Sequence, residues 1–382
     1  MRVLVDHIVF QQQKIGGVTK ALTEMLSHLP SDVVPIFAMK ESDNLYIRES
    51  FSDIIDKPKL TFDNFLGGKP FRGRKRLYET LSGGGLIPSM ESVNKKYCRR
   101  LMSKGDYDVF QPTHYNSHFL RYNRKPFVFI VHDLVPEMFP EYFPADFSDI
   151  IQREILVTKA DRIVAISENT KKDILARWRV PEDRVEVIYW GAPDVSGIEF
   201  KKVVPYEYIL YVGGRTRYKG FDFFVRQAAG FLRSRKDLRV VCTGSDFTPT
   251  ELSVLEELGI RNQFVAMTVS TEILFSLYHF ALCFVFPSEY EGFGLPTLEA
   301  MACGCPVILS DASCFPEIGG DAALYMKRYA SGGSNLGELL DYVAGLDVDH
   351  RERLISACTA RAAEFSWDEC GRKYAEVYKS LI

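Results

Sequence analysis

Two carboxylates flank a glycine turn in the second half of the chain. Glu291 and Glu299 stand with seven residues between them, and Gly292, Gly294 and Pro296 lie in that interval. The glycines let a ligand approach the backbone closely, and the proline favours a helix start, whose unpaired N–H groups suit a phosphate. Because a carboxylate repels phosphate, we expect Glu291 and Glu299 to accept hydroxyls of a sugar and a ribose. The alternative is a glycine turn with acidic surface residues.

Two cations follow an expected strand that ends in Gly213 and Gly214. Arg215 and Lys219 stand four residues apart in this loop. Cations beside a cleft can neutralise a departing diphosphate through charge-assisted hydrogen bonds. We therefore interpret this pair as a leaving-group site, against the alternative of a solvated basic loop.

A histidine and an aspartate, His132 and Asp133, directly follow an expected strand at 127–131. In an open parallel sheet, ligands bind at the carboxyl ends of the strands, so both side chains are expected to face a cleft. A lone histidine at a strand end is more often structural. The other motifs are what favour a functional role for this one.

A glycine pair, Gly16 and Gly17, precedes the first expected helix. Such a pair can approach a phosphate or an acceptor, although glycine pairs are common in loops. The same long loop holds three glutamines and a lysine at 11–14, which are candidates for contacts with acceptor hydroxyls. Weaker candidates at strand ends are Ser167, an expected helix cap, and Thr113–Asn116.

Short apolar strands alternate with amphipathic helices, which predicts parallel sheets covered by helices on both faces. The pattern restarts after a turn-rich linker at 191–206. We therefore expect an α/β protein with two Rossmann-like parallel-sheet domains facing a central cleft: residues 1–190, completed by a C-terminal helix at 366–382, and residues 207–365. The expected strands are 2–5, 33–38, 109–111, 127–131, 162–165, 185–188, 208–212, 238–243, 281–286, 306–309 and 323–325.

Composition excludes several classes of protein. The 382 residues include 47 Lys and Arg against 50 Asp and Glu, a net charge of −3, which argues against a generic DNA-coating protein. No apolar run approaches the ~18 residues of a membrane-spanning helix, and the first residues read as a buried strand rather than a signal peptide. The 8 cysteines form no Cys-x-x-Cys pair, so a reduced cytoplasmic location is expected.

The run from Glu291 to Glu299 around Gly-Phe-Gly-Leu-Pro resembles the donor site of retaining glycosyltransferases of family 4, which have the two-domain GT-B fold. The similarity covers nearly the whole chain, is close in the second half and is weak from 45 to 102. The resemblance implies that Glu299 holds the ribose of a nucleotide and that Glu291 faces the donor sugar. It also implies that backbone amides of Phe293–Leu295 contact the sugar and diphosphate.

The resemblance assigns roles to the other motifs as well. Arg215 and Lys219 match the family's diphosphate-binding pair. His132 matches a histidine that lies beneath the donor sugar, and the loop at Gly16–Gly17 matches one that points across the cleft. Met267 lies where the family holds the nucleotide base, mostly through the backbone.

The reaction implied is transfer of a hexose from a nucleoside diphosphate to an oligosaccharide hydroxyl with retention. The family is generally metal-independent, so no metal and no cofactor besides the nucleotide sugar are expected. Charge neutralisation then falls to Arg215, Lys219 and the helix at Thr297. The departing phosphate oxygen can take the acceptor proton. His132 or Asp133 could contribute, but neither is expected to be a covalent nucleophile.

The donor is assigned from two stretches. The segment His132–Pro136 and the segment Phe139–Phe143 resemble bacterial mannosyltransferases, which favours GDP-mannose. UDP-glucose, UDP-galactose and UDP-hexosamines stay open. Other classes considered are a sugar-nucleotide epimerase of the same fold, a phosphorylase-like enzyme with a lysine-bound pyridoxal cofactor, and a non-catalytic binding protein.

Residues 57–105 carry twelve basic and three acidic side chains, a local charge of +9, with aromatic and aliphatic residues between them. A basic, aromatic surface suits an anionic bilayer or a lipid-diphosphate-linked acceptor. We therefore expect a cytoplasmic protein that contacts the inner face of the membrane peripherally. The alternative is a solvated loop and helix, and nucleic acid is not an expected partner because no base-stacking fold is evident.

Overall fold

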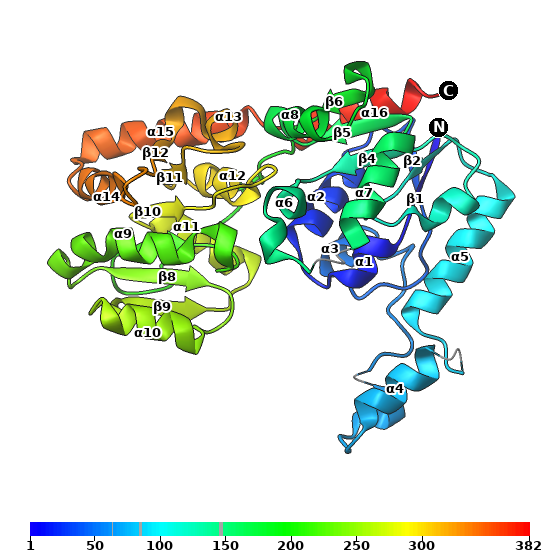
Figure 1. The fold of residues 1–382 in the computed structure, drawn as a ribbon, viewed down its shortest axis with the longest axis horizontal. Helices are drawn as coiled ribbons and strands as arrows, with labels where there is room; N and C mark the ends of the chain where they lie inside the picture. The colour runs from blue at the N-terminus through cyan, green and yellow to red at the C-terminus, as the bar shows by residue number, and fades with distance from the viewer. Residues whose placement is uncertain (63, 84–85, 145–147) are drawn as a thin grey trace.

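The computed structural model describes residues 1–62, 64–83, 86–144 and 148–382, and it shows two α/β domains side by side (Figure 1). In the first domain, all strands are parallel and run in the orders β2-β1-β3 and β4-β5-β6. A bridge between Phe110 and Phe127 joins the two groups. The strands are β1 (Arg2–Val5), β2 (Val34–Phe37), β3 (Val109–Gln111), β4 (Val128–Val131), β5 (Arg162–Ala165) and β6 (Val185–Val187).

The second domain contains one parallel sheet in the order β12-β11-β10-β7-β8-β9. The order reverses between β7 and β10, which pair directly, and the loops after these two strands carry the basic and glutamate motifs. This is the topological switch point at which open sheets bind ligands. The strands are β7 (Tyr208–Tyr211), β8 (Arg239–Thr243), β9 (Phe264–Met267), β10 (Cys283–Phe286), β11 (Val307–Ser310) and β12 (Leu324–Met326).

Helices cover both faces of the sheets, so the strands are apolar on both faces: every residue of β4, β7, β10 and β11 is buried. First-domain helices are α1 (Ile8–Gln12), α2 (Gly17–Ser27), α3 (Leu45–Ser50), α4 (Arg74–Gly83), α5 (Met90–Lys104), α6 (Val135–Met138), α7 (Ser148–Lys159) and α8 (Glu168–Arg177). Second-domain helices are α9 (Phe221–Ser234), α10 (Pro249–Glu257), α11 (Thr271–Phe280), α12 (Leu295–Ala302), α13 (Phe315–Gly319), α14 (Leu336–Ala344) and α15 (Val348–Ala363).

The C-terminal helix α16 (Trp367–Lys379) crosses back and packs against α2 of the first domain (Figure 1). The two helices approach so closely that a side-chain carbon at Gly371 would lie 2.1 Å from the carbonyl oxygen of His28. Tyr374 and Tyr378 are fully buried, and the Tyr378 hydroxyl donates to Gln111 Oε1 at 2.9 Å. The first domain is therefore completed by residues that follow the second.

The fold class expected from the sequence is confirmed, and all eleven expected strands are present to within two residues. The expectation of a long open loop at 11–14 was wrong in part, because Gln11 and Gln12 end helix α1. This short helix forms because the Asp6 carboxylate accepts the Ile8 amide at 3.1 Å and because Val9 and Phe10 are buried. Within the described residues, no helix is long and apolar enough to cross a membrane.

Candidate active site

The glycine turn leads from β10 into helix α12. Gly294 adopts a left-handed conformation with φ of 78°, and α12 begins at the next residue with Pro296 in its first turn. At Gly292 a side-chain carbon would lie 1.6 Å from the carbonyl oxygen of His132, so only glycine fits there. The Ser167 hydroxyl also donates to the Gly292 carbonyl at 2.7 Å. The turn therefore lies against the ends of β4 and β5 of the other domain.

Glu291 forms an ion pair with Lys219. The ammonium lies 2.7 and 2.9 Å from the two carboxylate oxygens, and the two side chains are only 22% (lysine) and 14% (glutamate) exposed. Burial alone would lower the pKa of the Lys219 ammonium, but the adjacent Glu291 carboxylate together with Tyr218 and Asp133 raises the pKa on balance. The structure thus places a charged lysine and a carboxylate together at the switch point.

Arg215, by contrast, is held away from this pair. Its Nε donates to Glu251 Oε1 at 2.8 Å, and Nη2 donates to the carbonyl oxygens of Ser245 and Asp246, each at 2.8 Å. The guanidinium also lies 4.8 Å from the Phe247 ring centre. The expected pair of cations is therefore divided, and only Lys219 contacts the glutamate motif.

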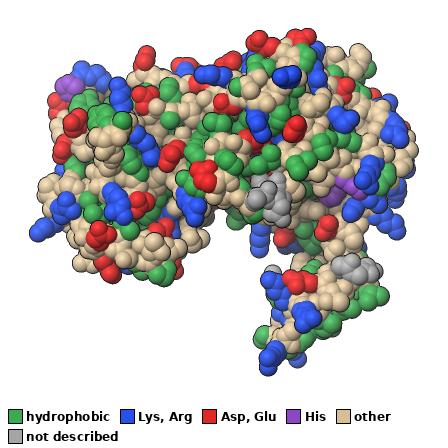
Figure 2. Space-filling model, in the orientation of Figure 1, with side chains coloured by type: hydrophobic (Ala, Val, Ile, Leu, Met, Phe, Trp, Pro, Cys, Tyr) green, Lys and Arg blue, Asp and Glu red, His purple; other side chains and the backbone are tan. Residues whose placement is uncertain are grey.

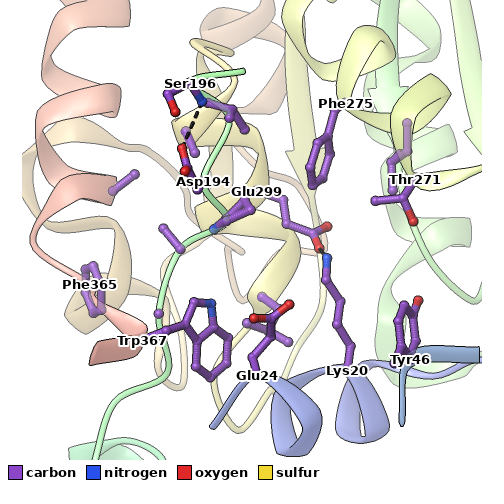
Figure 3. A pocket seen from close by; sticks show the side chains of 18 of the residues that line it. Lys20, Glu24, Tyr46, Asp194, Ser196, Thr271, Phe275, Glu299, Phe365 and Trp367 are labelled. Atoms are coloured by element: carbon purple, nitrogen blue, oxygen red, sulfur yellow. Dashed lines mark hydrogen bonds and ion pairs between the residues drawn. The ribbon is translucent and has the colours of Figure 1, made fainter. Parts of the chain in front are cut away.

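Glu299, on α12, is paired with a lysine of the other domain. Lys20 Nζ lies 2.6 Å from Glu299 Oε1 (Figure 3). The Tyr278 hydroxyl lies 3.4 Å from Glu299 Oε2. Local spacing in the sequence does not single out Lys20, which stands in the first turn of α2, shortly after Gly17. A cation in the turn that follows a glycine pair at a helix start was the available signal.

His132 is buried, and its Nδ1 has no hydrogen-bond partner among the described residues. Burial lowers the pKa of this imidazole to about 4, so the ring is neutral near pH 7. It packs against Trp190 with ring centres 5.6 Å apart. A neutral imidazole whose Nδ1 has no partner among the described residues is suited to a hydrogen bond with a hydroxyl.

Asp133 has a structural environment. Its Oδ1 accepts the Val135 amide at 3.0 Å at the start of α6 and lies 3.6 Å from the guanidinium of Arg153. That guanidinium also pairs with Glu137 at 3.1 Å, and Arg153 is 3% exposed. These contacts tie Asp133 to the first residue of α6 and to Arg153, in addition to its position after β4.

The other expected residues lie at the start of a helix or at the ends of strands. Gly16 is the N-cap of α2, whose first residue is Gly17. The Gly214 carbonyl accepts the Tyr211 hydroxyl at 2.9 Å, and Met267 ends β9 with its carbonyl bonded to the Gly244 amide. The segment Phe293–Leu295 forms the turn itself.

Thr297, in the first turn of α12, is fully buried. Its amide already bonds the Gly294 carbonyl at 2.8 Å, so this N–H is engaged within the turn. Its hydroxyl has no partner among the residues that the structure describes.

A cleft of about 1260 Å³ lies between the domains, and Glu299 is at its wall (Figure 3). Its lining combines α2, α3, the interdomain linker, the start of α11, α12 and the start of α16. The labelled side chains are Lys20, Glu24, Tyr46, Asp194, Ser196, Thr271, Phe275, Glu299, Phe365 and Trp367. Across the described ranges, no group of three or more His, Cys, Asp and Glu side chains is arranged to hold a metal ion.

Two family models match this chain in succession. The model described as Glycosyltransferase Family 4 matches residues 15–194, and the model described as Glycosyl transferases group 1 matches residues 198–336. Together with the fold, these matches define the class: a glycosyltransferase of the GT-B fold.

Two bacterial mannosyltransferases and one solved glycosyltransferase-fold structure are similar to this chain. The chain is 27% identical over 270 residues to the O-antigen chain mannosyltransferase RfbU of Salmonella typhimurium, covering 67% of this chain and 74% of that protein. It is 28% identical over 295 residues to O-antigen chain mannosyltransferase B of Escherichia coli, covering 72% and 75%. Among solved structures, Anabaena HepE in complex with UDP and glucose aligns with a TM-score of 0.70 at 17% identity, covering 100% of this chain and 99% of that one.

Proposed function

We propose that this protein is a retaining, metal-independent hexosyltransferase. It moves a hexose from a nucleoside diphosphate to a hydroxyl of a glycan or lipid-linked oligosaccharide, in the synthesis of a cell-surface polysaccharide. The observation that carries the proposal is the Lys219–Glu291 pair at the switch point, where Glu291 shortly precedes the start of α12 in the sequence. A cation and a helix N-terminus suit the diphosphate, and Glu291 and Glu299 suit hydroxyls.

The proposed step forms a bond between the acceptor oxygen and the anomeric carbon and breaks the bond from that carbon to the phosphate oxygen. The acceptor attacks the face that the phosphate leaves, and its proton passes to the departing phosphate oxygen. Lys219 stabilises the charge that develops on that phosphate. The neutral imidazole of His132 positions the donor sugar through a hydroxyl.

Mannose is the proposed hexose and GDP the proposed nucleotide. The two relatives named as O-antigen mannosyltransferases support this choice, as does the resemblance of His132–Pro136 and Phe139–Phe143 to mannosyltransferases. UDP-hexoses and UDP-hexosamines are the alternatives, because the structurally similar HepE was solved in complex with UDP and glucose. An epimerase of the same fold is the remaining rival.

A nucleotide screen tests the proposal directly. A ligand that binds only the native state raises the melting temperature, so GDP is expected to raise it more than UDP, ADP or CMP. GDP-mannose incubated without acceptor should then yield GDP and mannose at most. Conversion of the sugar to an epimer would indicate the rival, and no shift with any nucleotide would refute the assignment.

Peripheral contact with an anionic membrane from the cytoplasmic side is the second part of the proposal. Helix α4 extends away from the body of the first domain (Figure 1), and Figure 2 shows basic and hydrophobic side chains together on this projection. Residues 57–105 are called the basic arm here; residues 63 and 84–85 lie outside the described residues. Several of its large apolar side chains are exposed, among them Leu66, Phe71 and Leu86 at 60%, 46% and 76%. This combination suits anionic lipid headgroups and the upper acyl region.

A further inference from the structure

The carboxylate proposed to bind the ribose is already engaged across the domain boundary. Lys20 belongs to α2 of the first domain, and Glu299 belongs to α12 of the second. Their ion pair of 2.6 Å is largely sheltered, since the lysine side chain is 20% exposed and the glutamate side chain is 10% exposed. Burial alone would lower the pKa of Lys20, but Glu299 together with Tyr46 and Glu24 raises it on balance, so the ammonium stays charged.

We propose that Lys20 is a positioning residue that competes with the nucleotide for Glu299 and is displaced when the ribose binds. This inference rests on the proposed function of Glu299. A ribose diol donates two hydrogen bonds and is held best by both oxygens of one carboxylate. Here Lys20 occupies Oε1, and the Tyr278 hydroxyl lies 3.4 Å from Oε2. The sheltered carboxylate therefore has little room for both Lys20 and a diol.

The structure also offers the displaced ammonium a second partner. Glu24 stands one helical turn after Lys20 on α2, lines the same cleft and lies beside it in Figure 3. The Glu24 carboxylate contributes to the raised pKa of Lys20 already. Exchange from Glu299 to Glu24 keeps the ammonium compensated, so displacement does not leave a bare charge in the cleft.

The exchange has a consequence for the domains. The Lys20–Glu299 pair joins the two domains at the cleft wall, whereas a Lys20–Glu24 pair lies within one helix. Nucleotide binding would therefore release one interdomain contact at the same moment as it fills the donor site. Lys20 would act through Glu299 rather than by touching the reacting atoms.

Calorimetric titration with GDP, and with UDP in parallel, tests this competition. Lys20→Met removes the competitor and should tighten binding of whichever nucleotide the wild type binds, on the order of fivefold. Lys20→Arg keeps the ion pair and should bind as the wild type does. Lys236→Met is the matched control, because it removes one exposed lysine at the amino edge of the second sheet and should not alter affinity.

Testing Lys20→Met in a Glu299→Gln background separates the Lys20 competition from the assignment of Glu299 to the ribose. In Glu299→Gln, nucleotide affinity should fall, and adding Lys20→Met should then have no further effect. If Lys20→Met weakens binding or leaves it unchanged while Glu299→Gln weakens it, the competition is refuted and the ribose assignment survives. If Glu299→Gln leaves the affinity for both nucleotides unchanged, the ribose assignment fails and the competition fails with it.

Discussion

Replacing Lys219 by methionine tests the leaving-group assignment most directly. The substitution keeps most of the apolar stem and removes an ammonium that makes two charge-assisted hydrogen bonds to Glu291, at 2.7 and 2.9 Å. Because both side chains of the pair are well under one-third exposed, solvent screens this ammonium only in part. Loss of one such donor costs about 3–4 kcal/mol of transition-state stabilisation, which corresponds to a fall in kcat of roughly 100- to 1,000-fold.

The assay compares two donors. With GDP-mannose, Lys219→Met should show the full loss of kcat. With a nitrophenyl mannoside, whose leaving group carries no diphosphate, the loss should be less than about tenfold. Arg217→Met is the matched control, because Arg217 lies two residues away with its guanidinium 5.2 Å from the Tyr142 ring centre and does not contact the glutamate motif. An equal loss with both donors would show that Lys219 does not serve the leaving group.

Glu299→Ala should weaken binding of the nucleoside diphosphate by roughly 1–3 kcal/mol. Glu291→Ala should leave that binding nearly unchanged and lower turnover. Calorimetric titration of both variants tests this difference, and equal losses of affinity would contradict the assignment. The pKa of His132 is lowered from 6.5 to about 4, so the unfolded chain binds more protons between these values and stability should fall as pH drops through this window. Urea titrations at pH 7 and pH 4.5 should show that His132→Gln reduces this loss of folding free energy by about 2–3 kcal/mol. The pH dependence that comes from His7 and Asp6 is the same in the wild type and the variant and therefore cancels in the comparison. An unchanged pH dependence would exclude a buried neutral imidazole. Finally, replacing Lys69, Arg72, Lys75 and Arg76 together by Gln should abolish co-sedimentation with anionic vesicles and leave nucleotide binding intact. Binding of the wild-type protein to the vesicles should weaken as the salt concentration rises. Arg74 is left unchanged in that variant because it donates to the carbonyl oxygens of Gly68 and Phe62 within the basic arm, and undiminished sedimentation would argue against a membrane surface.

Local pattern was sufficient for the fold and for the glutamate turn. Strands buried on both faces read as continuous apolar runs, and the glycines around Pro296 marked the start of α12 because few other residues fit there. The Gly292 contact with His132 could not be read from spacing, since it depends on how two separate sheets meet.

Long-range charge pairing was the part that could not be predicted. Lys20 and Glu299 are 279 positions apart, and no periodicity links them. Arg215 looked like a partner for Lys219 because the two are close in sequence. In the structure its guanidinium contacts Glu251, which caps α10 together with Thr248, and this tertiary contact could not be read from local spacing.

The return of α16 to the first domain affects the order in which the chain can fold. Helix α2 presents an apolar face that is covered by Tyr374 and its neighbours, and these residues leave the ribosome only after the whole second domain. The second domain can therefore complete its own core while the first still exposes that face. Removing α16 should accordingly destabilise the first domain, on which it packs, rather than the second domain, which it follows in the sequence.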